Sequence, residues 1–79
     1  MRNPLQKIKE KNGWSIREFA SVAGMSFTAT YNCLNGNTQK INQRILKAVE
    51  QMGYDPEEIK KEYQEYREAK QQELMQEAI

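Results

Sequence analysis

The chain contains 79 residues, of which 38% are hydrophobic and 29% are charged. A chain of this length forms one small domain, and it has no apolar run long enough to span a bilayer. With no histidine and one cysteine, Cys33, it lacks the usual general base, a zinc-binding set and an internal disulfide. We therefore expect neither an enzyme nor a metal or cofactor site. We expect the cytoplasm as its location, since no apolar segment follows Met1 as in a signal peptide.

The charges are unevenly distributed along the chain. Residues 1–54 carry eight basic and three acidic side chains, a net charge of +5, whereas residues 55–79 carry four basic and eight acidic side chains, a net charge of −4. The formal net charge of +1 is the sum of these two parts. A basic body with an acidic tail favours a polyanionic partner for the body alone.

The first helix is predicted within residues 3–13. Asn3 has the residue type of an N-cap, Pro4 suits the first helical position, and Gly13 ends the helix. Leu5 and Ile8 form its apolar stripe.

A capping box predicts the start of the second helix. The Ser15 hydroxyl can accept a hydrogen bond from the Glu18 amide while the Glu18 carboxylate accepts one from the Ser15 amide. Trp14 and Phe19 lie at the two positions of a hydrophobic staple around this box. The helix is expected to reach about Ala23.

Three more helices are predicted further along the chain. Gly24 ends the second helix in a left-handed conformation, and Ser26 caps a third helix that reaches Leu34. A fourth helix is expected around residues 42–52, and a longer one begins at Asp55 and extends into the 70s. Signals for strands are absent, so we predict an all-α fold of five helices with an extended C-terminal helix. Residues 1–54 form its body and residues 55–79 its tail.

The third helix has two contrasting faces at 100° per residue. One face must pack inward, and it comprises Ala29, Thr30, Cys33 and Leu34. The other face offers hydrogen-bonding groups or apolar edges without any acid, and it comprises Thr28, Tyr31, Asn32 and Asn35, with Phe27 at the border. A solvated helix face usually carries Glu and Lys, so this face needs another explanation.

An acid-free face with short polar groups suits the major groove of DNA. The residues predicted to contact bases are Phe27, Thr28, Tyr31 and Asn32. The residues predicted to bind the phosphate backbone flank this helix, and they are Arg17, Ser26, Asn35, Asn37, Thr38, Lys40 and Arg44. Double-stranded DNA is the expected partner.

Residues 5–60 resemble the Xre-like helix-turn-helix family, which includes phage repressors and Cro. The resemblance rests on the "NG" after the third helix, on "ILKAVEQMGYDPEEI", and on the spacing of Phe19, Ala20, Ala23, Gly24 and Met25. It implies a repressor-type helix-turn-helix domain and a bacterial or phage regulator of transcription. In this family a polar residue often stands at the positions of Ile16 and Phe27.

Two functions remain open at this point. The first is a sequence-specific DNA-binding regulator, expected to be a repressor as the family resemblance implies, that acts as a weak homodimer or dimerises on DNA. The second is a protein-interaction adaptor, similar to an anti-repressor or an antitoxin, that keeps the helix-turn-helix fold. In either case the tail carries an apolar stripe at helical spacing that could serve dimerisation or a protein partner. This stripe comprises Ile59, Tyr63, Tyr66 and Leu74. The alternative is that the stripe packs on the chain's own domain.

Overall fold

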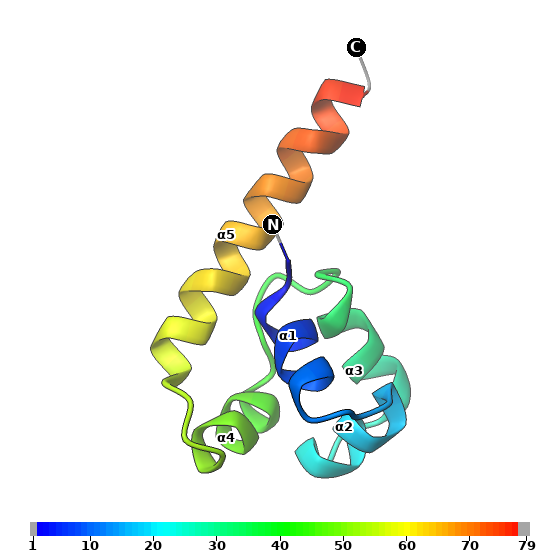
Figure 1. Ribbon diagram of the computed structural model, residues 1–79. Helices are drawn as coiled ribbons and strands as arrows, with labels where there is room; N and C mark the ends of the chain where they lie inside the picture. The colour runs from blue at the N-terminus through cyan, green and yellow to red at the C-terminus, as the bar shows by residue number, and fades with distance from the viewer. Residues whose placement is uncertain (1, 78–79) are drawn as a thin grey trace.

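The structure is a computed structural model that describes residues 2–77 of the chain. This part of the chain contains five α-helices joined by short turns and loops (Figure 1). They are α1 (Pro4–Lys11), α2 (Ile16–Ala23), α3 (Phe27–Leu34), α4 (Gln43–Gln51) and α5 (Pro56–Glu77). Residues 2–77 contain no strand. The predicted all-α fold, with four short helices and one long C-terminal helix, is therefore confirmed.

Side-chain caps start the helices where the sequence predicts them. Asn3, Ser15 and Ser26 each accept a hydrogen bond from a backbone amide in the first turn of the helix that follows. The capping box is complete, because the Ser15 amide donates to Glu18 Oε1 at 3.0 Å. This bond from the Ser15 amide holds the pKa of the Glu18 carboxyl below its ordinary value. Asn42 caps α4 in the same way, through a 2.8 Å bond to the Arg44 amide.

Glycines end the first four helices. Gly24 follows α2 with a φ of +66°, and the next amide, that of Met25, donates to the Ala20 carbonyl at 3.0 Å. Gly36 follows α3 with a φ of +72°, and an added Cβ there would lie 2.6 Å from a ring carbon of Tyr66. Only glycine therefore satisfies both the backbone conformation and the close packing at position 36.

The core lies where the four short helices meet the first half of α5. Its fully buried members include Leu5, Phe19, Leu34, Ile45 and Val49. The ring of Trp14 packs edge-on against that of Phe19 at 5.7 Å, as the staple predicts. Cys33 is also buried, as expected of a small core residue. These apolar contacts, rather than helix propensity, hold such short helices together.

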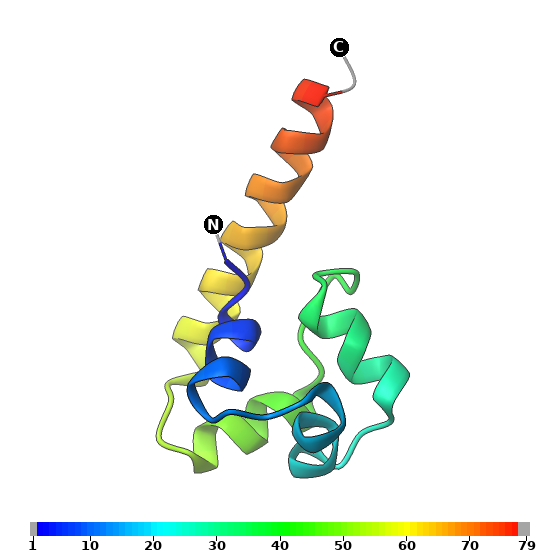
Figure 2. The same ribbon diagram turned by 45° about the vertical axis from the view of Figure 1, so that its right-hand side comes forward.

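The third helix forms an outer edge of the molecule. It packs on α2 and α1, and α1 lies between it and the first half of α5 (Figure 2). Thr30 lies fully buried on its inner face and donates from Oγ1 to the Ser26 carbonyl at 3.0 Å. Three of the four inward positions predicted for α3 are therefore confirmed, Thr30, Cys33 and Leu34, whereas Ala29 is half-buried, and the opposite side of the helix faces outward.

Two of the four tail residues predicted for dimerisation belong to the chain's own core. Ile59 is 6% exposed and Tyr63 is fully buried. They cannot form the surface of a dimer or of a partner site, which corrects the expectation for these two residues. The reason is that α5 packs on α1 and α4 with the face that carries them.

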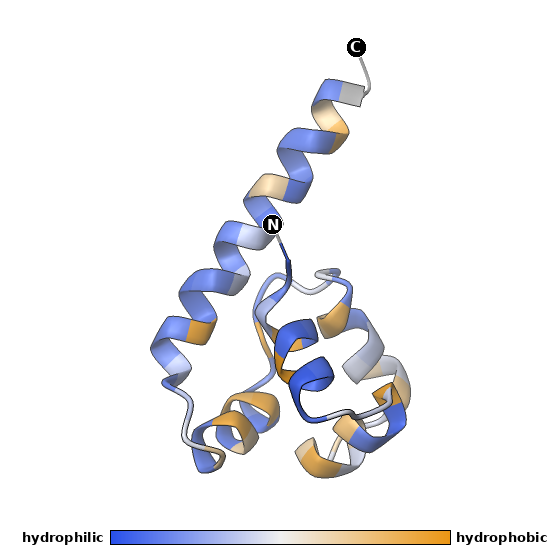
Figure 3. Ribbon diagram, viewed as in Figure 1, coloured by the Kyte–Doolittle hydropathy of each residue, from blue (hydrophilic) through white to orange (hydrophobic). Residues whose placement is uncertain are grey.

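The second half of α5 extends beyond the body (Figure 1), and residues 71–76 are all exposed. This helix is hydrophilic along most of its length (Figure 3). Leu74 and Met75 are the exceptions near its end, with exposed fractions of 59% and 63%. Among the described residues, no helix is both long and apolar enough to cross a membrane. Residues 78 and 79 of the predicted tail lie outside the described residues.

Candidate nucleic-acid interface

Two helices and a three-residue turn present the candidate surface. The turn comprises residues 24–26 between α2 and α3. Arg44 on α4 donates from its guanidinium to the Gly24 carbonyl at 2.8 Å, which ties the turn to α4. Arg44 was predicted to bind phosphate, and in the structure it is an exposed side chain that also supports the turn.

The outward face of α3 carries the four residues predicted to contact bases. Phe27 and Tyr31 are each 45% exposed, Thr28 is exposed, and Asn32 is half-buried. The helix contains no Asp, Glu, Lys or Arg. The face is therefore uncharged, and it combines hydroxyl and amide groups with two aromatic rings.

A cation and two rings are stacked along this face. The guanidinium carbon of Arg17, from the first turn of α2, lies 5.4 Å from the centre of the Phe27 ring. The Phe27 and Tyr31 rings lie 6.1 Å apart with an interplanar angle of 19°. This stack was not predicted, although the spacing of four residues between Phe27 and Tyr31 is a sequence signal for it.

The C-terminal end of α3 is fixed from its inner side. The side-chain amide of Asn3 donates from Nδ2 to the carbonyls of Cys33 and Leu34, at 2.9 Å in both cases. The side-chain amide of Gln6 also donates to the Leu34 carbonyl, from Nε2 at 3.4 Å. The last carbonyls of a helix have no partner within the helix, and here α1 supplies one, so that α3 is held at a defined position on the body.

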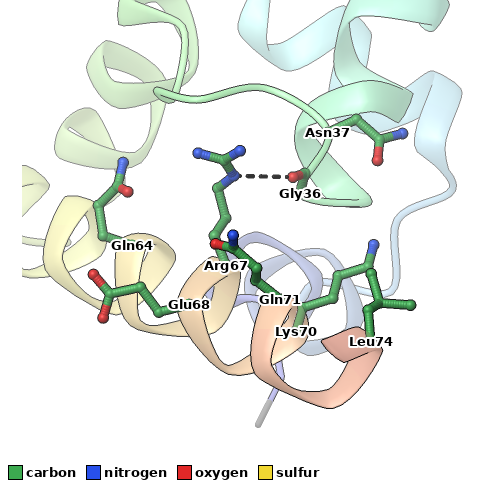
Figure 4. A pocket seen from close by; sticks show the side chains of 8 residues that line it. All are labelled: Gly36, Asn37, Gln64, Arg67, Glu68, Lys70, Gln71 and Leu74. Carbon is green, nitrogen blue, oxygen red and sulfur yellow. Dashed lines mark hydrogen bonds between the residues drawn. The ribbon is translucent and has the colours of Figure 1, made fainter. Parts of the chain in front are cut away.

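Basic side chains of α5 bind the next carbonyls along the chain. Lys70 Nζ donates to the Asn35 carbonyl at 2.8 Å, and Arg67 Nε donates to the Gly36 carbonyl at 3.1 Å. Figure 4 shows Arg67 extending from α5 to Gly36 at the edge of a shallow pocket. Both cations lie at the negative end of the α3 dipole, where positive charge is stabilising. Neither residue was predicted from the sequence to support α3.

Side chains of α5 also donate hydrogen bonds to backbone carbonyls of the segment between α3 and α4. Gln64 Nε2 donates to the Gln39 carbonyl at 2.7 Å, and the Tyr63 hydroxyl donates to the Thr38 carbonyl at 2.7 Å. Thr38 Oγ1 also lies 2.9 Å from the Tyr63 hydroxyl and 3.6 Å from Cys33 Sγ. The predicted role of Thr38 in binding phosphate is wrong for its side chain, because its hydroxyl is directed into the protein.

The other residues predicted to bind phosphate lie around α3. Asn37 and Lys40 are exposed on the segment that follows it. Ser26 is exposed at its start, where the hydroxyl oxygen accepts from the Ala29 amide at 3.2 Å. Asn35 is half-buried at its end. The surface thus has donors at both ends of α3, and Arg17 beside its first turn.

Comparison with known proteins gives no match. No family model matches the chain, and neither a curated protein nor a solved structure matches it. The resemblance to the Xre-like family therefore stays a prediction from the residues that carry it.

Proposed function

We propose that this chain is a sequence-specific DNA-binding regulator of transcription, a repressor-type helix-turn-helix protein of a bacterium or phage. It acts on double-stranded DNA in the cytoplasm, inserts α3 into the major groove and pairs weakly on two half-sites. The observation that carries the proposal is the outward face of α3, which is exposed, uncharged and able to form hydrogen bonds.

This face has the properties that a groove requires. Base edges in the major groove present donors, acceptors and thymine methyl groups. The hydroxyl of Thr28 and the amide of Asn32 match the first two, and the aromatic rings match the methyl groups. An acidic residue on α3 would be repelled by the phosphates, and the helix contains none.

The charges around the face support the same orientation. Residues 1–54 carry a net charge of +5. Arg17 and Arg44 are exposed beside the start of α3 and the turn before it, and Lys40 is exposed on the segment between α3 and α4. These side chains bind phosphates on either side of the groove and set the register of the helix. The first half of the acidic helix α5 packs on α1 and α4, with α1 between it and α3, and its second half extends beyond the body (Figure 2), so that most of its negative charge lies at a distance from the outward face of α3.

A mobility-shift assay on DNA selected from random duplexes tests the proposal. Replacing Asn32 by Ala should weaken binding to the selected sequence by about 1–3 kcal/mol, because one base-edge contact is lost. The thermal midpoint should stay nearly unchanged, since the side chain makes no internal hydrogen bond among those found in the described residues. Gln51→Ala, at an exposed position at the end of α4, is the matched control and should bind like the parent chain. Unaltered binding of a folded Asn32→Ala variant would contradict the proposal.

A protein-interaction adaptor is the second candidate. The exposed pair Leu74 and Met75, at the end of an acidic helix, favours it. An adaptor of this kind, similar to an anti-repressor or an antitoxin, would use the tail and leave α3 free. If the chain is an adaptor, it should retard no duplex in a mobility-shift assay at low salt. If it is a DNA-binding regulator, it should retard duplexes, and the retardation should weaken as the salt concentration rises.

A further inference from the structure

The outward face of α3 has residue types suited to two of the four bases. Guanine is most often bound by Arg or Lys, and the amino group of cytosine by a carboxylate. Neither kind of side chain occurs in Phe27–Leu34. Adenine is bound by Asn or Gln, and the thymine methyl group by apolar groups such as a Phe ring or the Thr methyl group. The face offers Asn32 for the first, and Phe27 and Thr28 for the second.

The apolar part of the face is already ordered. Arg17 covers the Phe27 ring on one side at 5.4 Å, and Tyr31 lies almost parallel to that ring at 6.1 Å. A ring held in this way loses little conformational freedom when a ligand contacts its remaining edge. Phe27 is nevertheless 45% exposed, so that apolar surface remains for a contact.

From these observations we infer that the chain binds an A·T-rich half-site, in which Phe27 contacts the C5-methyl group of a thymine. Asn32 hydrogen-bonds an adenine in the same half-site. The inference rests on the proposed function and names the class of DNA sequence for the same surface. The Arg17 guanidinium stabilises the position of the ring and lies beside the first turn of α3, where the phosphate backbone would pass.

Substitution of uracil for thymine isolates the methyl contact. The full chain first selects its preferred duplex from a random pool, and A·T pairs should dominate each half-site. Each thymine is then replaced singly by uracil, which removes one methyl group and leaves base pairing unchanged. At one position per half-site the affinity should fall about fourfold, the factor expected for burying one such group. Phe27→Ala should bind the thymine and uracil duplexes equally.

Two further variants control for the loss of apolar surface. Phe27→Leu keeps an apolar group at the contact and should retain a preference for thymine. Val22→Ala removes an apolar side chain that is 47% exposed on α2, and should leave the ratio of the two affinities unchanged. Melting curves verify the folding of each variant, which is expected because both positions are exposed.

The outcomes separate this inference from the proposed function. A G·C-rich selected site, or equal binding of thymine and uracil duplexes by the parent chain, overturns the inference alone. A guanine preference that disappears in Arg17→Ala also overturns it, since Arg17 would then contact a base. Failure to bind any duplex at low salt overturns both proposals.

Discussion

Tyr63 connects the tail to the body at the scale of a single residue. Its ring is fully buried, and its hydroxyl bonds both the carbonyl and the hydroxyl of Thr38. A buried hydroxyl without partners would be costly, and here two polar groups of one residue satisfy it. The side chain therefore fixes the segment after α3 while it fills the core.

Replacing Tyr63 by Phe tests this role. The ring stays and the hydroxyl is lost, so the Thr38 carbonyl loses a partner and the free energy of unfolding should fall by about 1–2 kcal/mol. Denaturant titration measures the change. Tyr31→Phe is the matched control, and it should alter stability by less than about 0.5 kcal/mol because its hydroxyl belongs to an exposed side chain.

The same residue makes stability depend on alkaline pH. Burial raises the pKa of the Tyr63 hydroxyl above its ordinary value of 10.0. Ionisation is thus easier in the unfolded chain, so the contribution of Tyr63 is fully present below about pH 10 and is lost as the pH rises through the folded pKa. Stability measured between pH 8 and pH 11 should fall less steeply in Tyr63→Phe. A slope equal to that of the parent chain would contradict the stated cause.

Lys40 is the residue whose proposed phosphate contact is simplest to measure. It is exposed on the segment after α3, so Lys40→Ala should leave the fold intact and weaken binding about equally on all sequences. The slope of log affinity against log salt should become shallower by about 0.9, the value for one phosphate. Lys61→Ala, exposed on α5, controls for the change in net charge and should keep the slope. A loss confined to one sequence would mean that Lys40 contacts a base.

At the scale of elements, the helix boundaries follow from local chemistry and could be predicted. A capping box, an N-cap Asn or Ser and a following glycine act within a few residues, so "WSIREF" and "AGMS" contain all that starts α2 and separates it from α3. The packed and outward faces of α3 follow from its period of 3.6 residues in the same way.

Contacts across the fold could not be predicted from the same patterns. Asn3 binds carbonyls of α3 about 30 positions away, and Arg67 and Lys70 have the spacing of a solvated helix face. Their partners are backbone carbonyls. Because every residue has a backbone carbonyl, the sequence does not indicate which one a distant side chain will bind. The inward position of Thr38 escaped prediction for a related reason, because its partner Tyr63 lies 25 residues away.

Helix α5 stabilises the end of α3 through Arg67 and Lys70. Replacing either residue by Met keeps the helix and most of the apolar stem but removes the donor to the Gly36 or Asn35 carbonyl. We expect each variant to lose about 1 kcal/mol of stability in denaturant titrations. Lys61→Met, at an exposed position on α5, is the control and should lose none. Unchanged midpoints for Arg67→Met and Lys70→Met would show that water replaces both bonds without cost.

At the scale of the whole molecule, the two ends of α5 differ in role. The molecule measures 41 × 23 × 21 Å, and residues 71–76 of α5 are all exposed. Its first half supplies core residues, so removal of all of α5 would unfold the body rather than test the tail. Tyr66 packs against Gly36. Leu74 and its neighbour Met75 are the large apolar residues exposed on the described part of α5, and they remain the candidates for the proposed pairing of two copies.

A pair of substitutions at these positions tests the proposed dimer. Burying one Leu and one Met side chain contributes about 2 kcal/mol each, and association itself costs at least about 4 kcal/mol. We therefore expect two copies to pair weakly in solution, and we expect DNA that aligns two half-sites one helical turn apart to complete the pairing. The double variant Leu74→Gln and Met75→Gln keeps the helix and the charge. It should sediment as a monomer at concentrations where the parent chain associates. It should also bind two half-sites without cooperativity, while its affinity for a single half-site stays unchanged.

Val22→Gln on α2 is the control, because it removes a comparably exposed apolar group and should preserve cooperative binding. If the double variant still binds two half-sites cooperatively, another surface joins the two copies.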